Sequence, residues 1–542
     1  MAEQKQEYKK ARAGRQILRW LGVGLLAILL ILAVICQAPW KAVTPLALCL
    51  AALALLPEQA RKWFWLAASV VLIAVVVWIF LPDGDGAWVP FTFTQELAGH
   101  EARYTIPESQ NAAIIYDKLL AGYVPNEWRM RFLPKAVYDQ TLSEPWRSGD
   151  HPALAQWLDK HKKILMALPE ACGIKTCRFP SDFKLSAADS SQIYRYSALK
   201  SWALALLLSG NNDVAEGRPD EGFLKYVEAL QIAAHLYQQK RTHDFLIGFG
   251  IEGIALPRIN RFLVESNISE KQLHLVTETL GNLENNWSKD FLQCFEYDRL
   301  FVKNAFCSLV YQTDAKGDVR LSRDPAAPIS GFRRPRTPAQ AYWQRKSMKA
   351  SAMFAWFFLP STPHKAAELI DAVFEQYRSM ADPNFAWEKE DSARSGFHSL
   401  NCHFLVWPLI NRTTLQYDGF HNIYPKRLLQ RRGARVLIAL KQYRLGNGRW
   451  PENLDAIRPS VPAEALIDPQ NNGSFVYECA GQTFTLYSKG KNGMDNDGRR
   501  SISPTGGSAL PEQVEDDVLF WPPKNREPAE EIPDLNLSNA NE

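Results

Sequence analysis

Residues 17–81 read ILRWLGVGLLAILLILAVICQAPWKAVTPLALCLAALALLPEQARKWFWLAASVVLIAVVVWIFL, an almost uninterrupted apolar block. Two short polar loops divide the block into runs at about 17–36, 41–56 and 63–81. The first and last runs are long enough to cross a hydrocarbon core of about 30 Å at about 1.5 Å per residue. The sequence therefore predicts a membrane unit of three transmembrane helices, with the lipid bilayer as a partner.

Basic residues in the tail 1–16 set the predicted orientation of this unit. Positive charge beside a span stays in the cytoplasm, so three spans release the chain outside it after Pro82. We therefore expect a multi-pass protein of the bacterial inner membrane with an extracytoplasmic body. The middle run is shorter and contains Pro45. If it only dips into the bilayer, two spans leave the body in the cytoplasm. A cleaved signal peptide does not fit, because the apolar region is too long and no cleavage site follows it.

Length and composition predict a large ordered body beyond the apolar block. The chain has 542 residues, a formal net charge of +4 and 11% aromatic residues, including 17 Trp. Large rings at this frequency are typical of a packed core. The charges form no basic stripe of the kind that nucleic acid requires, which argues against a nucleic-acid partner. Residues 523–542 are predicted to form a disordered acidic tail.

Helical periodicity dominates the region that follows a predicted linker at 82–105. Residues 106–423 are predicted to form a helical body with a Pro-, Gly- and Arg-rich surface loop at 313–338. Within it, helices at 191–209 and 219–239 flank the turn GNNDVAEGR. This hairpin resembles a tetratricopeptide-type pair in architecture, although no strict repeat period is present. We therefore expect a mainly α body with an α-solenoid-like, TPR-like stack of helices.

The pattern changes again in the segment 424–522. A helix at 424–445 is followed by two runs of alternating apolar and polar residues, SFVYEC and QTFTLYS, separated by Ala480 and Gly481. Alternation of this kind around a glycine predicts two antiparallel strands joined as a β-hairpin. The sequence therefore predicts a small C-terminal α+β domain.

Several short motifs in this segment occur in a known order. They are Tyr443, Leu445, Gly448, Trp450 and Pro451; Asp468 and Pro469; Tyr487, Ser488 and Gly490; and an acidic loop with Asp495, Asn496, Asp497, Asp516 and Asp517. In this respect the segment resembles the globular domain of the major pseudopilin of type II secretion. The whole chain also resembles uncharacterised bacterial membrane proteins with a helical body ahead of such a domain.

The resemblance implies a calcium site in the acidic loop, with Asp495, Asp497, Asp516 and Asp517 as its candidate ligands. Clustered carboxylates suit a hard cation that takes six to eight oxygen ligands. A solvated surface turn is the alternative interpretation of the same residues. Pseudopilins polymerise through one N-terminal apolar helix, whereas here the pseudopilin-like segment is C-terminal. This difference favours a reused folding module over a pseudopilus subunit.

Catalytic and metal-binding patterns are weak elsewhere in the chain. Cys172 and Cys177 are close enough in sequence to form a disulfide in an oxidising compartment. No C-x-x-C occurs, which argues against a structural zinc site. The segment HSLNCH at 398–403 could hold a metal or a Cys–His pair, but ordinary core or surface histidines explain it much better. Glu228 and Glu252 lie within predicted helices, and we expect each to pair with an Arg or Lys of a neighbouring helix.

These observations predict a membrane-anchored extracytoplasmic scaffold that binds a protein or peptide and has no evident catalytic motif. The concave face of a helical stack is a common binding surface. One alternative is a component associated with type II secretion and its pseudopilus. The other is a hydrolase whose site lies hidden between helices.

Overall fold

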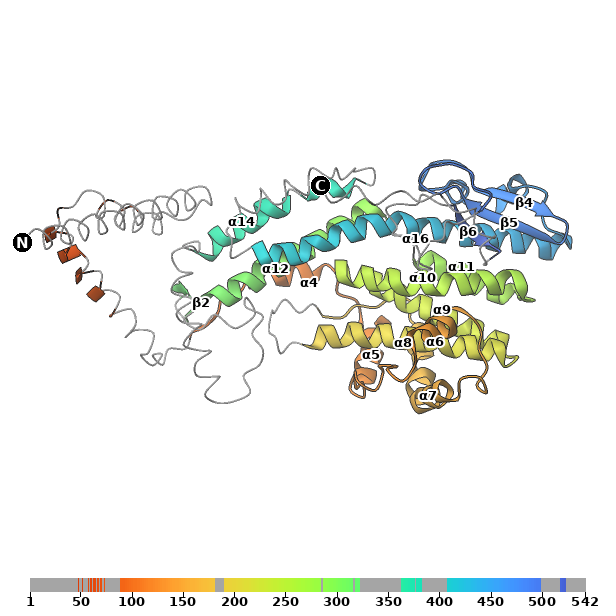
Figure 1. Ribbon diagram of the computed structural model, residues 1–542, viewed down its shortest axis with the longest axis horizontal. Helices are drawn as coiled ribbons and strands as arrows, with labels where there is room; N and C mark the ends of the chain where they lie inside the picture. The colour runs from red at the N-terminus through yellow and green to blue at the C-terminus, as the bar shows by residue number, and fades with distance from the viewer. Residues whose placement is uncertain are drawn as a thin grey trace, which may run out of the picture. The chain divides into compact units, whose positions relative to one another are not determined.

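The computed structural model describes most of the chain after residue 87. The described residues are 88–180, 190–283, 286–314, 317–321, 362–375, 377–382, 407–498 and 517–522, with scattered positions between 47 and 73. These residues are mainly helical and include two three-stranded antiparallel sheets (Figure 1). The helical character of the body and the antiparallel C-terminal strands agree with the prediction.

The predicted transmembrane helices require a correction. Among the described residues, no helix is both long enough and apolar enough to cross a membrane. The longer helices carry too many charges; α10 (Thr242–Glu265) alone contains Asp244, Glu252, Arg258 and Arg261. On this finding, the transmembrane part of the predicted fold class and the multi-pass inner-membrane location are wrong. Most of residues 17–81, where the three spans are predicted, lies outside the described residues.

The chain divides into two compact units. The first comprises residues 1–103, 181–190 and 295–415, and the second comprises residues 104–180, 191–294 and 416–542. The segments of each unit are far apart in sequence. The predicted boundary between residues 423 and 424 falls inside the second unit, within one long helix.

The described part of the first unit combines short strands with helices. Its elements are β1 (Val89–Pro90), α4 (Thr94–Ala102), the C-terminal half of α12 (Trp287–Val310), β2 (Tyr311–Thr313), β3 (Val319–Leu321), α14 (Pro363–Glu375) and the 3-10 turn Arg378–Ala381. The strands form the antiparallel sheet β1-β2-β3. Helix α4 lies within the predicted linker, and β3 lies within the predicted loop. Lys303 of α12 bonds to both Glu96 and Asp371, at 3.1 and 3.2 Å, and so joins three helices.

The second unit contains most of the described helices. They are α5 (Ala113–Leu120), α6 (Lys135–Ser143), α7 (Pro152–Cys172), α8 (Ser190–Ala215), α9 (Pro219–Tyr237), α10, α11 (Glu270–Asn282), the start of α12 and most of α16 (Trp407–Asn447). The 3-10 turns Glu108–Gln110, Leu454–Ser460 and Ala463–Leu466 and the strands β4 (Val476–Ala480), β5 (Thr483–Ser488) and β6 (Val518–Trp521) complete it. Helix α9 packs against α7 on one side and against α10 and α11 on the other, which produces a layered stack of helices (Figure 1).

Two glycines set the closest approach between α8 and α9. A β-carbon on Gly210 would lie 2.6 Å from the Tyr226 ring and 2.9 Å from the Gly222 carbonyl. A β-carbon on Gly222 would meet the Gly210 carbonyl at a similar distance, 2.6 Å. Only glycine at both positions lets the two backbones approach this closely. The GNNDVAEGR segment is therefore largely helical packing surface, and α8 continues six residues beyond its predicted end at 209 to Ala215.

Helix α16 completes the core of the second unit. The Phe420 ring lies 5.3 Å from Phe245 and 5.7 Å from Phe249 of α10, and 4.9 Å from Trp287. Further along α16, Gly433 leaves room for the Phe520 ring of β6. The predicted hairpin is present as the pair β4–β5, and β6 joins the far edge of β5 in the order β4-β5-β6.

Candidate functional site

The acidic loop that follows β5 contains the four predicted calcium ligands, of which the structure describes Asp495, Asp497 and Asp517. Asp495 Oδ1 accepts hydrogen bonds from the Tyr487 hydroxyl at 2.7 Å and from the backbone N–H of Asp497 at 3.1 Å, while its Oδ2 lies 3.2 Å from Lys489 Nζ. The Tyr487 hydrogen bond is the main cause that lowers the pKa of Asp495. Asp517 Oδ2 accepts from the backbone amides of Asn496 and Gly498, at 2.9 and 2.8 Å. Both carboxylates thus hold the loop against the sheet.

These contacts give the described acids a structural role. No group of three or more His, Cys, Asp or Glu side chains suited to a metal occurs among the described residues. Asp495 lies 3.2 Å from the Lys489 cation, and Asp517 accepts from two backbone amides. Asp516 lies outside the described residues. Calcium binding by the full predicted set stays a prediction.

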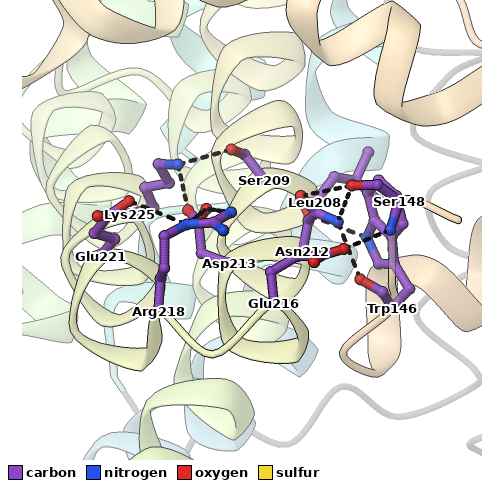
Figure 2. Close-up of polar contacts among 10 residues, drawn as sticks. All are labelled: Trp146, Ser148, Leu208, Ser209, Asn212, Asp213, Glu216, Arg218, Glu221 and Lys225. Atoms are coloured by element: carbon purple, nitrogen blue, oxygen red, sulfur yellow. Dashed lines mark hydrogen bonds and ion pairs between the residues drawn. The ribbon is translucent and has the colours of Figure 1, made fainter. Parts of the chain in front are cut away.

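A buried aspartate anchors the end of α8 to the start of α9. Asp213 is 4% exposed and accepts from Arg218 Nη2 at 2.7 Å and from Lys225 (Figure 2). Lys225 also donates to the Ser209 hydroxyl at 2.9 Å. One buried carboxylate with two cationic partners satisfies the rule that buried charge must be paired. The arrangement closes the turn between the two helices.

The neighbouring face of α8, with Leu208, Asn212 and Glu216, holds the segment that follows α6. Asn212 Nδ2 donates to the Trp146 carbonyl at 3.1 Å and to the Ser148 hydroxyl at 3.0 Å (Figure 2). Glu216 accepts from the Ser148 backbone N–H at 2.8 Å, and the Trp146 indole donates to the Leu208 carbonyl at 3.0 Å. The polar residues of the GNNDVAEGR segment, which are typical of a turn, therefore bond to residues distant in sequence, and the helix continues through them.

A buried ion pair joins α10 to α16. Glu252 is fully buried, and its carboxylate accepts from Arg431 Nε at 2.7 Å and from Arg431 Nη2 at 2.6 Å. The Tyr237 hydroxyl donates to the same carboxylate at 2.5 Å. Burial by itself lowers the pKa of Arg431. The negative charge and the hydrogen bonds of Glu252 together have the larger effect, so the pKa of Arg431 is raised. The prediction that Glu252 pairs with a basic residue of a neighbouring helix is confirmed.

A thiol, an imidazole and a phenol meet between α5, α7 and α9. The Tyr116 hydroxyl lies 3.0 Å from His235 Nδ1 and 3.9 Å from Cys172 Sγ. His235 Nε2 lies 2.7 Å from the Ile174 carbonyl, which can only accept, so Nε2 carries the proton and Nδ1 accepts from Tyr116. The Cys172 thiol donates to the Glu228 carbonyl at 3.5 Å. Sequence reasoning missed this cluster, because its members are separated by up to 119 positions.

The pKa shifts in this cluster do not favour nucleophilic catalysis. Burial raises the pKa of the Cys172 thiol well above its usual value and lowers that of His235 to about 4. A catalytic thiolate instead needs a lowered thiol pKa beside an imidazolium. The neutral groups therefore brace three helices. Burial also raises the pKa of the Glu228 carboxyl to about 7, and Glu228 forms no ion pair with any described residue, contrary to the prediction.

The remaining predicted residues have simple outcomes. Cys172 and Cys177 are both free thiols, and burial raises the pKa of each. His398, Cys402 and His403 of the HSLNCH segment lie outside the described residues. 

Comparison with known proteins adds no assignment. No family model, no curated protein and no solved structure matches this chain. The resemblance of residues 424–522 to a pseudopilin domain accordingly stays a prediction.

Proposed function

We propose that the chain is a helical scaffold that binds a protein or peptide partner. The observation that carries the proposal is the layered stack of the second unit, in which α9 is enclosed by α7, α10 and α11. Stacks of this kind present long side surfaces formed by successive helices. The buried polar clusters at Asp213, Glu252 and His235 support the same function, because they hold the helices together and supply no activated nucleophile.

The outer face of α7 is our candidate for the contact surface. Met166 on this helix is 70% exposed, and Lys162 and Lys163 precede it by one turn and are also exposed. Residues three and four apart lie on one helical face, so the methionine has a basic border. A partner with an apolar side chain beside acidic groups complements this face.

Site-specific photo-crosslinking tests the proposal. A photoreactive residue placed at Met166 should form one defined adduct in cells, identified by mass spectrometry. The matched control is Ala153, which is also exposed and lies about 140° around the same helix from Met166. Adducts that are absent at both positions, or equal at both, would contradict a contact surface on this face of α7.

A further inference from the structure

A second arginine of α16 lies beside the Glu252–Arg431 pair. Arg427 precedes Arg431 by one helical turn, and its guanidinium lies over Gly253 of α10. A β-carbon at Gly253 would overlap the Arg427 guanidinium, so the glycine creates the space that this group fills. The side chain is partly exposed, which leaves it accessible to a small solute.

Most donor groups of Arg427 have no partner within the described part of the chain. Its Nη1 donates to the Gln430 side chain, while its Nε is buried and no described residue accepts a hydrogen bond from it. A guanidinium has five N–H donors in a rigid fork, and leaving a buried donor unsatisfied costs about 1–3 kcal/mol. Among the described residues, Arg427 forms no ion pair within 4 Å.

The charges around Arg427 do not balance. The ionisable groups that act on it are Glu252, Tyr237 and Arg431. Glu252 already accepts two hydrogen bonds from Arg431, and the Tyr237 phenol stays neutral because burial raises its pKa. Two guanidiniums therefore share one carboxylate, and burial lowers the pKa of Arg427. A partly buried cation without its own counter-charge is unfavourable.

We infer that Arg427, placed over Gly253 beside the Glu252–Arg431 pair, is the recognition residue of an oxyanion-binding site. The ligand is a carboxylate or phosphate group that accepts hydrogen bonds from the free edge of the guanidinium. Bidentate, charge-assisted bonds to such a group are the strongest that arginine forms. The site lies between α10 and α16 and is independent of the surface of α7.

Isothermal titration calorimetry on the full chain tests the site, with inorganic phosphate and acetate as separate probes in chloride buffers of matched ionic strength. We expect one equivalent of saturable binding for at least one probe. Arg427→Gln should weaken it by about tenfold or more, the size expected for loss of a charged hydrogen bond. Gly253→Ala should also weaken it, because the new methyl group displaces the guanidinium without changing any charge.

Matched variants separate this site from general electrostatics. Arg449→Gln removes a cation whose side chain is 68% exposed and should leave the affinity unchanged. Arg427→Lys keeps the charge but loses the fork, and should still weaken binding. Thermal unfolding without ligand checks that each variant is folded. Stronger binding of phosphate or of acetate identifies the ligand group as phosphoryl or carboxyl. The inference is overturned if neither probe saturates, or if the Arg427 and Arg449 variants bind alike.

Discussion

Single buried side chains in the second unit make its stability depend on pH in opposing ways. Burial raises the pKa of Glu228 from 4.5 to about 7, so the folded state holds a proton that the unfolded state releases across this window. The free energy of unfolding therefore falls as pH rises from 4.5 to 7, by about 3 kcal/mol from this group. Burial lowers the pKa of His235 from 6.5 to about 4, so the unfolded state binds a proton at a higher pH than the folded state does. The free energy of unfolding therefore falls as pH falls through that range.

Glu228→Gln should reveal the His235 contribution. Between about pH 4.5 and 6.5 the two groups oppose each other, so their combined effect in the native chain is small. In the variant, the free energy of unfolding should rise with pH from about 4 to 6.5. Urea unfolding at several pH values measures this, with Glu221→Gln as the exposed control. Parallel pH profiles for native chain and variant would rule out a raised Glu228 pKa.

The Glu252–Arg431 pair is a second test at the residue scale. Glu252→Gln leaves the Arg431 guanidinium buried without its counter-charge, and removing one partner of a buried pair typically costs about 3–5 kcal/mol. Glu265→Gln breaks the exposed pair with Arg261 on the same helix and should cost less than about 1 kcal/mol. Denaturant unfolding compares the two variants, and similar losses would contradict a buried, energetically coupled pair.

At the scale of elements, the α8–α9 hairpin depends on two glycines. Gly210→Ala places a methyl group against the Gly222 backbone and should destabilise the second unit by about 1–3 kcal/mol. Gly250→Ala is the matched control, because a β-carbon there meets nothing within 4 Å. Alanine in an open helical position should instead stabilise the helix by up to about 1 kcal/mol. In thermal unfolding, the midpoint temperature should fall for Gly210→Ala and rise for Gly250→Ala.

Local signals in the sequence predict some helices well and others poorly. Pro219 marks the start of α9, and the predicted bounds of this helix, 219–239, lie within two residues of those observed. The predicted end of α8 at residue 209 is wrong. The local pattern there indicates a turn, but Asn211 donates to the carbonyls of Thr141 and Leu142 of α6, at 2.8 and 3.1 Å, and the helix continues. Partners nearly 70 positions away leave no local signal.

At the scale of the molecule, α16 belongs to the same packed unit as helices that begin 300 residues earlier. Its Phe420 covers Phe245 and Phe249, and its Lys441 donates to the Ser266 carbonyl at 2.8 Å. A chain that stops at Leu415 loses all these contacts. We expect its helices to lose cooperative unfolding and to bind a hydrophobic dye, as loosely packed states do. Circular dichroism and dye fluorescence measure both properties.

The converse fragment gives the control for this prediction. Residues 424–522 alone contain the strands β4, β5 and β6 but lack α10, whose Phe249 ring lies 6.2 Å from that of Tyr424. We expect this fragment to be less stable than the same residues in the whole chain. A fragment with native stability would instead support a separate C-terminal domain.

The candidate sites show how far sequence reasoning reaches. The position of the acidic loop after β5 follows from the alternating pattern, and the pairing of Glu252 follows from its burial. The partner of Glu252 is 179 positions away, and the place of Arg427 over Gly253 depends on how two helices approach each other. The periodicity of a single helix carries no information about which residues of two distant helices come into contact. The sequence therefore does not predict these two contacts.

The late position of α16 in the chain also matters during synthesis. Phe249 leaves the ribosome 171 residues before Phe420, the ring that covers it. At about 5–20 residues per second, this interval lasts roughly 10–30 seconds. Throughout that time α16 is not yet complete, and the apolar face of α10 that it will cover stays exposed to solvent. The nascent chain therefore spends a long interval as a natural client for chaperones that shield exposed apolar surfaces.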